Sequence, residues 1–334
     1  MAEFETLTLE AAEALMQSAL EAQGASAVVA ASVAQALVAA EAEGQAGHGF
    51  SRLEDYAAQL RSGKINGAAQ IAVSRPAPAQ VWVDADHGFA YPALEAARAE
   101  GVAVAAEMGM ASMAVSRSHH CGALSVQVAA LAEAGFIGLM VANTPSAIAP
   151  WGAREPLFGT NPIAFAVPRR DAAPLVIDLS LSVVARGKIM NAKKTGGEIP
   201  EGWALDADGQ PTTDPDAALA GSMVPIGDAK GTALALMVEV LAAVLTESTL
   251  SADATSFFAA EGDPPGVGQF LLAIKPRDGA GFAARLERLL ERIAECDGAR
   301  LPGMRREAAV ATARERGLQV PRAYAEVARR LAAG

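Results

Sequence analysis

Gln80-Val81-Trp82-Val83-Asp84, an alanine-rich segment over residues 93–108, and Ala111-Ser112-Met113-Ala114-Val115-Ser116 form the stretch that decides the fold. The first run alternates apolar and polar side chains, and the last is a short, mostly apolar run, so both are predicted strands. The alanine-rich segment between them is a predicted helix. This stretch therefore predicts a strand, a helix and a second strand in succession.

Outward from this stretch, strands and helices continue without a regular repeat. The further predicted strands are 136–142, 163–167, 175–177 and 270–274, and the further predicted helices are 123–134, 230–245, 282–296 and 304–332. Residues 143–182 are dense in Pro and Gly, and residues 183–222 are polar and rich in turns. Because strands and helices do not alternate as in a doubly wound sheet, the sequence favours a mixed α/β fold.

The first third of the chain is predicted to be mostly helical. Thr8 is the predicted N-cap of a helix that carries Leu9 and Met16 on one face and ends near Gly24. A second helix is predicted over residues 27–43, and a third over 53–60.

Composition limits the classes of function. The 334 residues carry a formal charge of −11 with scattered Lys and Arg, which argues against a nucleic-acid partner. The most apolar stretch, 28–40, is too short and too interrupted to span a membrane. The acidic N-terminus lacks the features of a secretion signal, and Cys121 and Cys296 lie far apart without a CxxC pair. We therefore expect a cytoplasmic protein with reduced thiols and no membrane partner.

His48 and Arg52 are four residues apart where the third helix is predicted to begin, which would place them on one face of its first turn. A guanidinium binds the carboxylate of a 2-oxo acid bidentately, and a histidine can protonate its carbonyl oxygen when hydride arrives. The pair thus indicates a site for a small carboxylate substrate. The alternative is an incidental histidine at a solvated helix end.

His119 and His120 follow a predicted strand and precede a predicted helix, a junction where loops build sites. Adjacent histidines point in different directions, and neither HExxH nor a Cys/His cluster accompanies them, so we predict no metal site. We expect one of the two to contact a ligand and the other to be structural.

Three weaker signals concern ligand binding. Gly159-Thr160-Asn161-Pro162 offers a hydroxyl in a fixed turn, and Asp178-Leu179-Ser180 and Lys230-Gly231 could bind ribose and phosphate, although ordinary turns and caps explain all three as well. Residues 279–284 fit GxGxxA, but too little chain follows for a Rossmann half. Any dinucleotide must therefore bind without the usual glycine-rich loop.

The motifs together resemble a known family. They are, in order, Gly47-His48-Gly49-Phe50-Ser51-Arg52, Ser118-His119-His120-Cys121-Gly122-Ala123, Gly159-Thr160-Asn161-Pro162, Asp178-Leu179-Ser180, Ala185-Arg186-Gly187-Lys188, Ile199-Pro200-Glu201-Gly202-Trp203, Pro211-Thr212-Thr213-Asp214, Lys230-Gly231 and Leu301-Pro302-Gly303. This order resembles that of the type-2 malate/L-lactate dehydrogenases, a family that includes ureidoglycolate, sulfolactate and diketogulonate dehydrogenases and cyclic-imine reductases. The resemblance covers nearly the whole chain.

The resemblance implies a non-Rossmann dinucleotide-binding fold with a largely antiparallel sheet, in a homodimer with the site near the subunit contact. It implies a helical, substrate-side domain from residues 1–75 and 280–334, and a cofactor-binding domain over 76–279. The implied cofactor is NAD or NADP.

The resemblance also implies roles for single residues. His48 and His120 match catalytic positions and compete for the part of proton donor, whereas Arg52 and Thr160 match substrate contacts. The implied cofactor-binding residues are His120, Cys121, Gly122, Asp178, Leu179, Ser180, Arg186, Gly187, Lys230, Gly303 and Arg305.

Three departures from the family's pattern bear on the reaction. Gly47 stands where many members have Ser, and Lys188 where the imine reductases have Asp, so His48 lacks the partners that those enzymes use. Asp228 lies beside the expected cofactor, and Met304 replaces a common Glu. We therefore expect reversible hydride transfer between NAD(P)H and a 2-oxo acid of the malate, lactate or sulfolactate type. The alternatives are a cyclic imino-acid reductase and a dinucleotide-binding protein without turnover.

Overall fold

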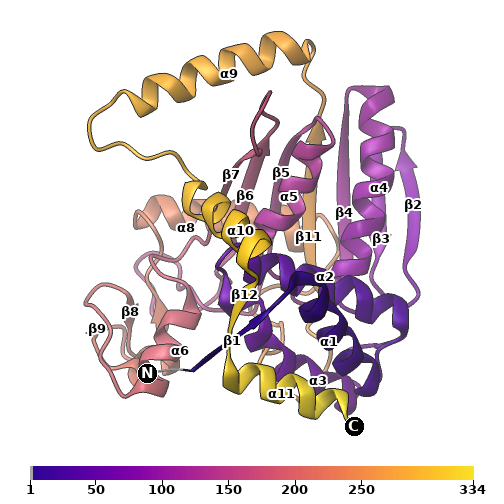
Figure 1. The fold of residues 1–334 in the computed structure, drawn as a ribbon. Coiled ribbons are helices and arrows are strands. Elements are labelled where there is room, and N and C mark those ends of the chain that lie inside the picture. Colours follow the sequence, from indigo (N-terminus) through magenta and orange to yellow (C-terminus); the bar gives the residue numbers. More distant parts are fainter. Residues whose placement is uncertain (1–2) are drawn as a thin grey trace.

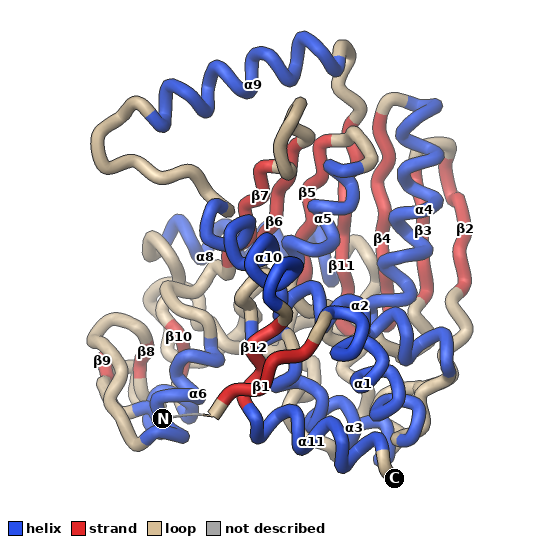
Figure 2. The backbone as a smooth tube through the Cα atoms, viewed as in Figure 1, coloured by secondary structure: helices blue, strands red, loops and turns tan. Residues whose placement is uncertain are grey.

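The computed structural model describes residues 3–334 and is built around one seven-stranded sheet (Figures 1 and 2). The strands run in the order β2 (Ala72–Ala77), β3 (Gln80–Asp84), β4 (Met110–Ser118), β11 (Val267–Ile274), β5 (Ile137–Ala142), β6 (Ile163–Val167) and β7 (Leu175–Leu179). Every neighbouring pair is antiparallel except β3 and β4. The predicted mixed α/β fold with a largely antiparallel sheet is confirmed.

Residues 80–116 form the predicted strand–helix–strand unit. β3 and β4 are parallel because helix α4 (Ala90–Met108) carries the chain back between them, as a parallel connection requires. Helices α4 and α5 (Leu124–Glu133) cover one face of the sheet (Figure 1). Met140 and Ala142 of β5 point into the core on that face, whereas Val141 between them points to the core on the other face.

The second face of the sheet is covered by α8 (Ala229–Glu239) and a π-helical turn, η3 (Val240–Val244). The sequence predicts this segment as one helix over 230–245. Beside it, the region predicted to be rich in turns contains α6 (Arg186–Thr195), α7 (Pro215–Ala220) and a three-stranded sheet of β8 (Ala204–Leu205), β9 (Pro211–Thr212) and β10 (Ser222–Met223). These short elements carry too few periodic apolar residues to be read from the sequence.

Segments near both chain ends form a helical layer at one end of the sheet (Figure 1). Its elements are β1 (Phe4–Leu7), α1 (Leu9–Ala22), α2 (Ala27–Ala42), the single turns η1 (Ala46–His48) and η2 (Phe50–Arg52), α3 (Leu53–Ser62), β12 (Leu318–Pro321) and α11 (Arg322–Ala332). Thr8 caps α1 as predicted, because its hydroxyl accepts from the Ala11 amide at 3.1 Å. β1 pairs with β12, so the predicted helical tail 304–332 is interrupted by a strand.

The remaining helices, α9 (Gly279–Ala294) and α10 (Met304–Arg316), link the sheet to this layer. α9 stands at the opposite end of the sheet from α1, α3 and α11 (Figure 2). It is held there by Arg169, whose Nη2 lies 2.8 Å from Glu287 Oε2. The division into domains 1–75 plus 280–334 and 76–279 stays a prediction, and residues 1 and 2 lie outside the described chain. None of the helices within residues 3–334 is both long and apolar enough to cross a membrane.

Candidate active site

His48 and Arg52 lie on η1 and η2, two consecutive single turns that precede α3. The prediction that they share the first turn of one helix is wrong, because Gly49 breaks the helical path between them. Helix α2 stabilises this break, since the Phe50 amide donates to Oε2 of Glu41 on α2 at 2.9 Å. A side chain at residue 49 would overlap that same carboxylate, so any larger residue would displace Glu41 from the Phe50 amide.

His48 stacks on His120, with ring centroids 5.4 Å apart and planes 16° from parallel. His120 comes from the loop between β4 and α5, so the pair joins the helical layer to the sheet. Nδ1 of His48 is buried and has no hydrogen-bond partner among residues 3–334. Burial and the positive charge of Arg52 lower the pKa of His48 to about 4, so the ring is neutral at pH 7.

Arg52 is the cation of the site. Its Nε donates to the Gly47 carbonyl oxygen at 2.8 Å, and its Cζ lies 4.6 Å from the ring centroid of Phe258. Nη1 is buried, and no acceptor for it exists in the described part of the chain. A buried donor without an acceptor is unfavourable, and a carboxylate would satisfy it in the paired geometry that guanidinium groups favour.

His119 and His120 have different surroundings, as the sequence leads us to expect. His119 lies among aromatic rings, with centroids 6.1 Å from Tyr56 and Phe89 and 5.1 Å from Phe257. Burial, helped by the charges of Lys64 and Arg52, lowers its pKa to about 3, so it packs as a neutral ring. His120 instead stacks on His48 and lies with Nδ1 2.5 Å from Tyr56 Oη.

Two tyrosines of the candidate site, Tyr56 and Tyr91, are not predicted from the sequence. Tyr56 lies on α3, where its hydroxyl is 2.9 Å from Tyr91 Oη. A signal for Tyr56 existed, because it follows Arg52 by four residues and so lies one helical turn further on. For Tyr91 the sequence contained no such signal, since it comes from the start of α4.

Residues of the loop before β11 also complete the site, and the sequence did not identify them. Phe257 contacts His120, with ring centroids 5.2 Å apart, and Phe258 lies against Arg52. α3 holds this loop, because Gln59 Nε2 donates to the Phe257 carbonyl oxygen at 2.7 Å. The positions of Phe257 and Phe258 in the site therefore depend on contacts between segments far apart in the sequence.

Thr160 belongs to the turn between β5 and β6. Its amide donates to Thr144 Oγ1 at 3.0 Å, and its carbonyl oxygen accepts from the Leu181 amide at 2.8 Å. The next residue, Asn161, has a positive φ of 38° and donates from Nδ2 to Glu239 Oε2 at 2.9 Å. These contacts fix the turn and leave Thr160 half-buried beside the end of β7.

The candidate cofactor residues lie along β7 and the loops beside it. Asp178 Oδ2 accepts from the Ser125 amide at 2.9 Å, so this carboxylate caps α5, and burial raises its pKa. Leu179 is exposed, and Ser180 Oγ accepts from Ser182 Oγ at 3.1 Å. Cys121 and Gly122 come from the loop that also carries His120, and burial raises the pKa of the Cys121 thiol to about 12.

Arg186, Gly187 and Lys230 lie at the starts of α6 and α8. The segment before α6 and the segment before α8 lie side by side, because the Ile226 amide donates to the Leu181 carbonyl oxygen at 2.8 Å. Arg186 is half-buried, its pKa is lowered by burial, and its Nη1 lies 3.4 Å from the Ser146 carbonyl oxygen. Lys230 is exposed, and a Cβ at Gly187 would meet open space. Two cations beside open backbone fit the phosphates of a dinucleotide.

Of the C-terminal candidates, Gly303 touches the sheet and Arg305 is exposed to solvent. A Cβ on Gly303 would lie 3.0 Å from the Val176 carbonyl oxygen, and its φ is 83°. The neighbouring Arg306, which the sequence did not single out, lies with Nε 3.0 Å from Glu43 Oε2. It thereby fastens α10 to the end of α2.

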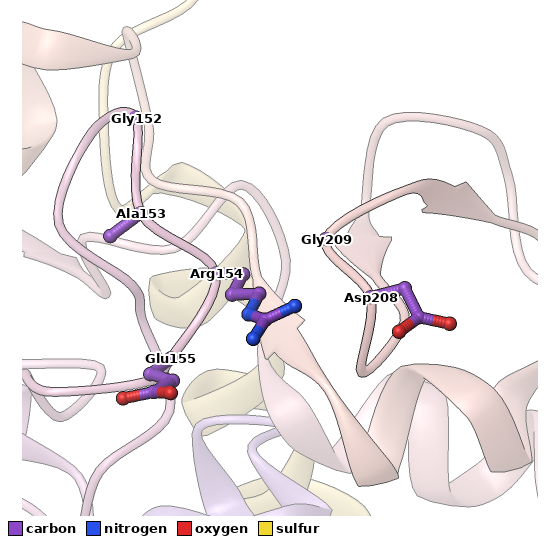
Figure 3. Close-up of a pocket in the computed structure, with 6 residues that line it drawn as sticks. All are labelled: Gly152, Ala153, Arg154, Glu155, Asp208 and Gly209. Carbon is purple, nitrogen blue, oxygen red and sulfur yellow. The ribbon is translucent and has the colours of Figure 1, made fainter.

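A hollow of about 440 Å³ elsewhere on the surface has no contact with these residues (Figure 3). It lies between the loop that carries Arg154 and Glu155 and the β8–β9 turn that carries Asp208 and Gly209; Arg154 extends toward that turn, whereas Glu155 points away from it. Its charged side chains are exposed. Within residues 3–334, no three His, Cys, Asp or Glu side chains gather as a metal site would require.

Comparisons with known proteins place the chain in a family. The model of the malate/L-lactate dehydrogenase family matches residues 7–327. The chain is 50% identical to a (2R)-3-sulfolactate dehydrogenase (NADP(+)) of Chromohalobacter salexigens over 96% of both chains. It is 41% identical to a Δ1-pyrroline-2-carboxylate/Δ1-piperideine-2-carboxylate reductase of Pseudomonas putida, over 92% of this chain and 91% of that protein.

The fold is also that of a solved enzyme. The crystal structure of Δ1-piperideine-2-carboxylate reductase from Pseudomonas syringae superposes with a TM-score of 0.93 at 38% identity, over 98% of this chain and 99% of the other. The match therefore extends over both the helical layer and the sheet.

Proposed function

We propose, from the premise that this chain belongs to the malate/L-lactate dehydrogenase family, that it is an NAD(P)-dependent oxidoreductase of small 2-oxo and 2-hydroxy acids. The sulfolactate dehydrogenase relative, at 50% identity, supports the sulfolactate, malate or lactate type. The observation that carries the proposal is the unpaired Nη1 of Arg52 beside the stacked His48 and His120.

In this proposal Arg52 binds the substrate carboxylate. Its Nε is already bonded to Gly47, and Phe258 fixes the guanidinium plane, so Nη1 faces the acid in a set orientation. Such positioning lowers the barrier because the reacting carbon is held in place before the reaction. The bound carboxylate would also offset the charge that depresses the pKa of His48.

The stacked histidines supply the proton in this proposal. NAD(P)H, when bound, would supply the hydride to the carbonyl carbon. A ring of the His48–His120 pair, neutral in the resting protein, would take up a proton from solvent once the carboxylate is bound, and would pass it to the carbonyl oxygen to give the 2-hydroxy acid and a neutral ring. In the reverse direction the same pair accepts the proton of the hydroxyl. Thr160 would contact the substrate from the β5–β6 turn.

NAD or NADP would be held along β7. Arg186 and Lys230 fit the phosphates, and the residues His120, Cys121, Gly122, Asp178, Leu179, Ser180, Gly187, Gly303 and Arg305 complete the proposed contacts. The sulfolactate dehydrogenase relative is named for NADP(+), which favours NADP.

Reduction of a cyclic imino acid is the second candidate, because two relatives of 38–41% identity carry that activity in their names. The substrate again has a carboxylate, here next to a C=N bond, so Arg52 would suit both. Gly47 offers no side chain. Lys188 lies on α6, where its Nζ is 6.0 Å from the ring centroid of Trp203. Neither residue gives His48 a Ser or Asp partner, which supports the 2-oxo acid.

We further infer a cytoplasmic homodimer. α8 and η3 expose one face of large apolar side chains, of the kind that protein interfaces cover. They are Leu234, Leu236, Met237, Val240, Val244 and Leu245. Both cysteines, Cys121 and Cys296, are free, as in a reducing compartment.

A substrate panel tests the function. Purified protein is assayed with sulfopyruvate, oxaloacetate, pyruvate and piperideine-2-carboxylate, each with NADH and NADPH, following nicotinamide absorbance. We expect turnover of a 2-oxo acid, with Arg52→Ala as the inactive control. Faster turnover of the imino acid would favour the second candidate. Binding of dinucleotide without any turnover would instead indicate a protein that has lost the reaction, and light scattering reports whether it is a dimer.

A further inference from the structure

A chain of hydrogen-bonded groups runs from His120 into the protein. Tyr56 Oη lies 2.5 Å from His120 Nδ1 and 2.9 Å from Tyr91 Oη. Tyr56 is 0% exposed and Tyr91 2%, and each hydroxyl is already hydrogen-bonded within the protein. Nδ1 of His120 is therefore the ring nitrogen that faces inward, and Nε2 is left for the substrate side.

Two arrangements of the protons satisfy this geometry. In the first, Tyr91 donates to Tyr56, and Tyr56 donates to Nδ1, so neutral His120 carries its own proton on Nε2. In the second, Nδ1 carries the proton and donates to Tyr56, and Tyr56 donates to Tyr91. The second arrangement leaves the Tyr91 proton to find an acceptor elsewhere.

The surroundings of Tyr91 favour the first arrangement. Within residues 3–334, Tyr56 is the one hydrogen-bond partner of Tyr91 Oη. Gly122, with a φ of 66°, lies against this hydroxyl, and a Cβ there would be 2.7 Å from Oη. Buried donors without an acceptor are rarer in proteins than oxygens that lack a donor, as backbone groups show, so the arrangement that pairs every proton is favoured. Burial raises the pKa of both tyrosines, so both hydroxyls keep their protons.

We propose that the Tyr91–Tyr56 pair holds the proton of neutral His120 on Nε2, and that Tyr56 is a positioning residue for this ring. Because a histidine offers its substrate only the nitrogen that its other hydrogen bond leaves free, the pair decides what His120 presents. His120 then presents an N–H donor to the reacting oxygen of the substrate. That oxygen gains negative charge as hydride arrives, and a donor fixed in advance stabilises it.

The same chain disfavours the imidazolium form of His120. Protonation of Nδ1 would require both hydroxyls to turn, and the Tyr91 proton would then lack an acceptor. The charged and titratable neighbours act in the same sense, since Arg52, His48 and His119 all lower the pKa of His120, after burial itself. His120 therefore stays neutral in the resting protein.

Nitrogen NMR of the resting protein tests this directly. The protein is labelled with 15N-histidine, and the signals of the four histidines are assigned with His48→Asn, His87→Asn and His119→Asn. For His120 we expect one protonated nitrogen, Nε2, and an unprotonated, hydrogen-bonded Nδ1 from pH 6 to pH 8. A proton on Nδ1 of His120 would overturn the proposal without any variant.

Variants add a second readout. Tyr56→Phe removes the donor to Nδ1, and we expect His120 to become a mixture of both tautomers. Tyr91→Phe should keep the tautomer, because Tyr56 still donates, while the Nδ1 signal moves toward that of an unbonded nitrogen. Tyr324→Phe, the remaining tyrosine, on α11, is the matched control and should leave every His120 signal in place. An unchanged His120 pattern in a folded Tyr56→Phe would overturn the proposal.

The kinetic arm rests on the proposed function, whereas the NMR arm does not. With the 2-oxo acid found in the panel, we expect Tyr56→Phe to lower kcat about tenfold or more and to leave KM within about twofold, since the lost interaction acts on the developing charge. Equal kcat values for Tyr56→Phe and the Tyr324→Phe control would contradict the role of the tyrosine pair. If the wild-type protein turns over nothing, the function fails while the tautomer is still decided by NMR.

Discussion

The two ends of helix α3 each carry a cation that contacts the loop before β11, and the two cations differ in how their hydrogen-bond donors are used. Just beyond the C-terminal end, Lys64 Nζ donates to the carbonyl oxygens of Ser256 at 2.8 Å, Ala259 at 3.0 Å and Glu261 at 3.2 Å. At the N-terminal end, Arg52 stacks on Phe258 and leaves Nη1 without an acceptor in the described residues.

The difference separates structure from function. An ammonium group has three donors, and Lys64 has placed all three on one loop, so it binds that loop and nothing else. Arg52 keeps a buried donor for which the fold supplies no acceptor in residues 3–334. Because buried polar groups are nearly always paired, this unpaired donor beside His48 and His120 supports the proposal that Arg52 binds a ligand. Lys64 is buried and Arg52 is half-buried, and their hydrogen bonds show which of them is fully paired.

The largest expected effect is that of Arg52→Ala on catalysis. Loss of the carboxylate ligand should lower kcat/KM by about a hundredfold or more, as for truncation of a buried charged partner. The free energy of unfolding should change by only about 1 kcal/mol, because one hydrogen bond is lost while an unpaired donor is removed. Steady-state kinetics and urea unfolding measure the two effects.

Arg52→Lys keeps the charge but not the paired geometry, so its kcat/KM should lie between that of the wild-type protein and that of Arg52→Ala. Arg61→Ala changes an exposed arginine of the same helix and should leave kcat/KM in place. A normal kcat/KM for Arg52→Ala would remove this residue from substrate binding.

Lys64→Met is expected to act on stability first. It leaves three carbonyl oxygens without their donor, so we expect a loss of about 2–4 kcal/mol in the free energy of unfolding, with a smaller loss of activity. Lys275→Met is the control, because Lys275 Nζ bonds a single carbonyl oxygen, that of Ala106, at the surface. Urea unfolding compares the two, and equal midpoints would show that Lys64 does not secure the loop.

The last expected effects concern the pH dependence of stability, and they report on both cations. His119 has its pKa lowered to about 3 by burial and then by Lys64 and Arg52, whereas His48 has its pKa lowered to about 4 by burial and Arg52. Since both values lie below the usual 6.5, the unfolded chain binds more protons in acid. Stability should therefore be complete above about pH 6.5 and fall as the pH drops toward 4, by about 1.4 kcal/mol per pH unit for each ring, and His120 adds to this fall because its pKa is also lowered.

Variants resolve the two contributions. His119→Phe should flatten this dependence by the share of one histidine. Lys64→Met should raise the pKa of His119 and not that of His48, whereas Arg52→Ala should raise both. Urea midpoints from pH 4 to 8 and NMR titration check these shifts. An identical pH dependence in His119→Phe would show that this ring titrates normally in the folded protein.

The sequence by itself determined the helices and strands whose apolar side chains follow a regular period, and the order of the family's motifs. Residues 80–116 gave the strand, the helix and the next strand because local periodicity follows from the geometry of each element. The ordered motifs gave the family, and with it His48, Arg52 and His120. The strands β1 and β12 escaped detection because they pair only with each other, from segments near the two chain ends. Helix α6 escaped detection because it carries too few periodic apolar residues.

The tertiary structure alone decided how the site is completed. Arg52 and Lys64 look alike in sequence, and only the loop from 256 to 261, which folds against α3, shows which of them is fully bonded. Tyr91 acts on His120 through Tyr56, a chain of contacts between three separate segments. Such pairings depend on which atoms meet after the chain has folded, and no periodicity or spacing within one segment encodes them.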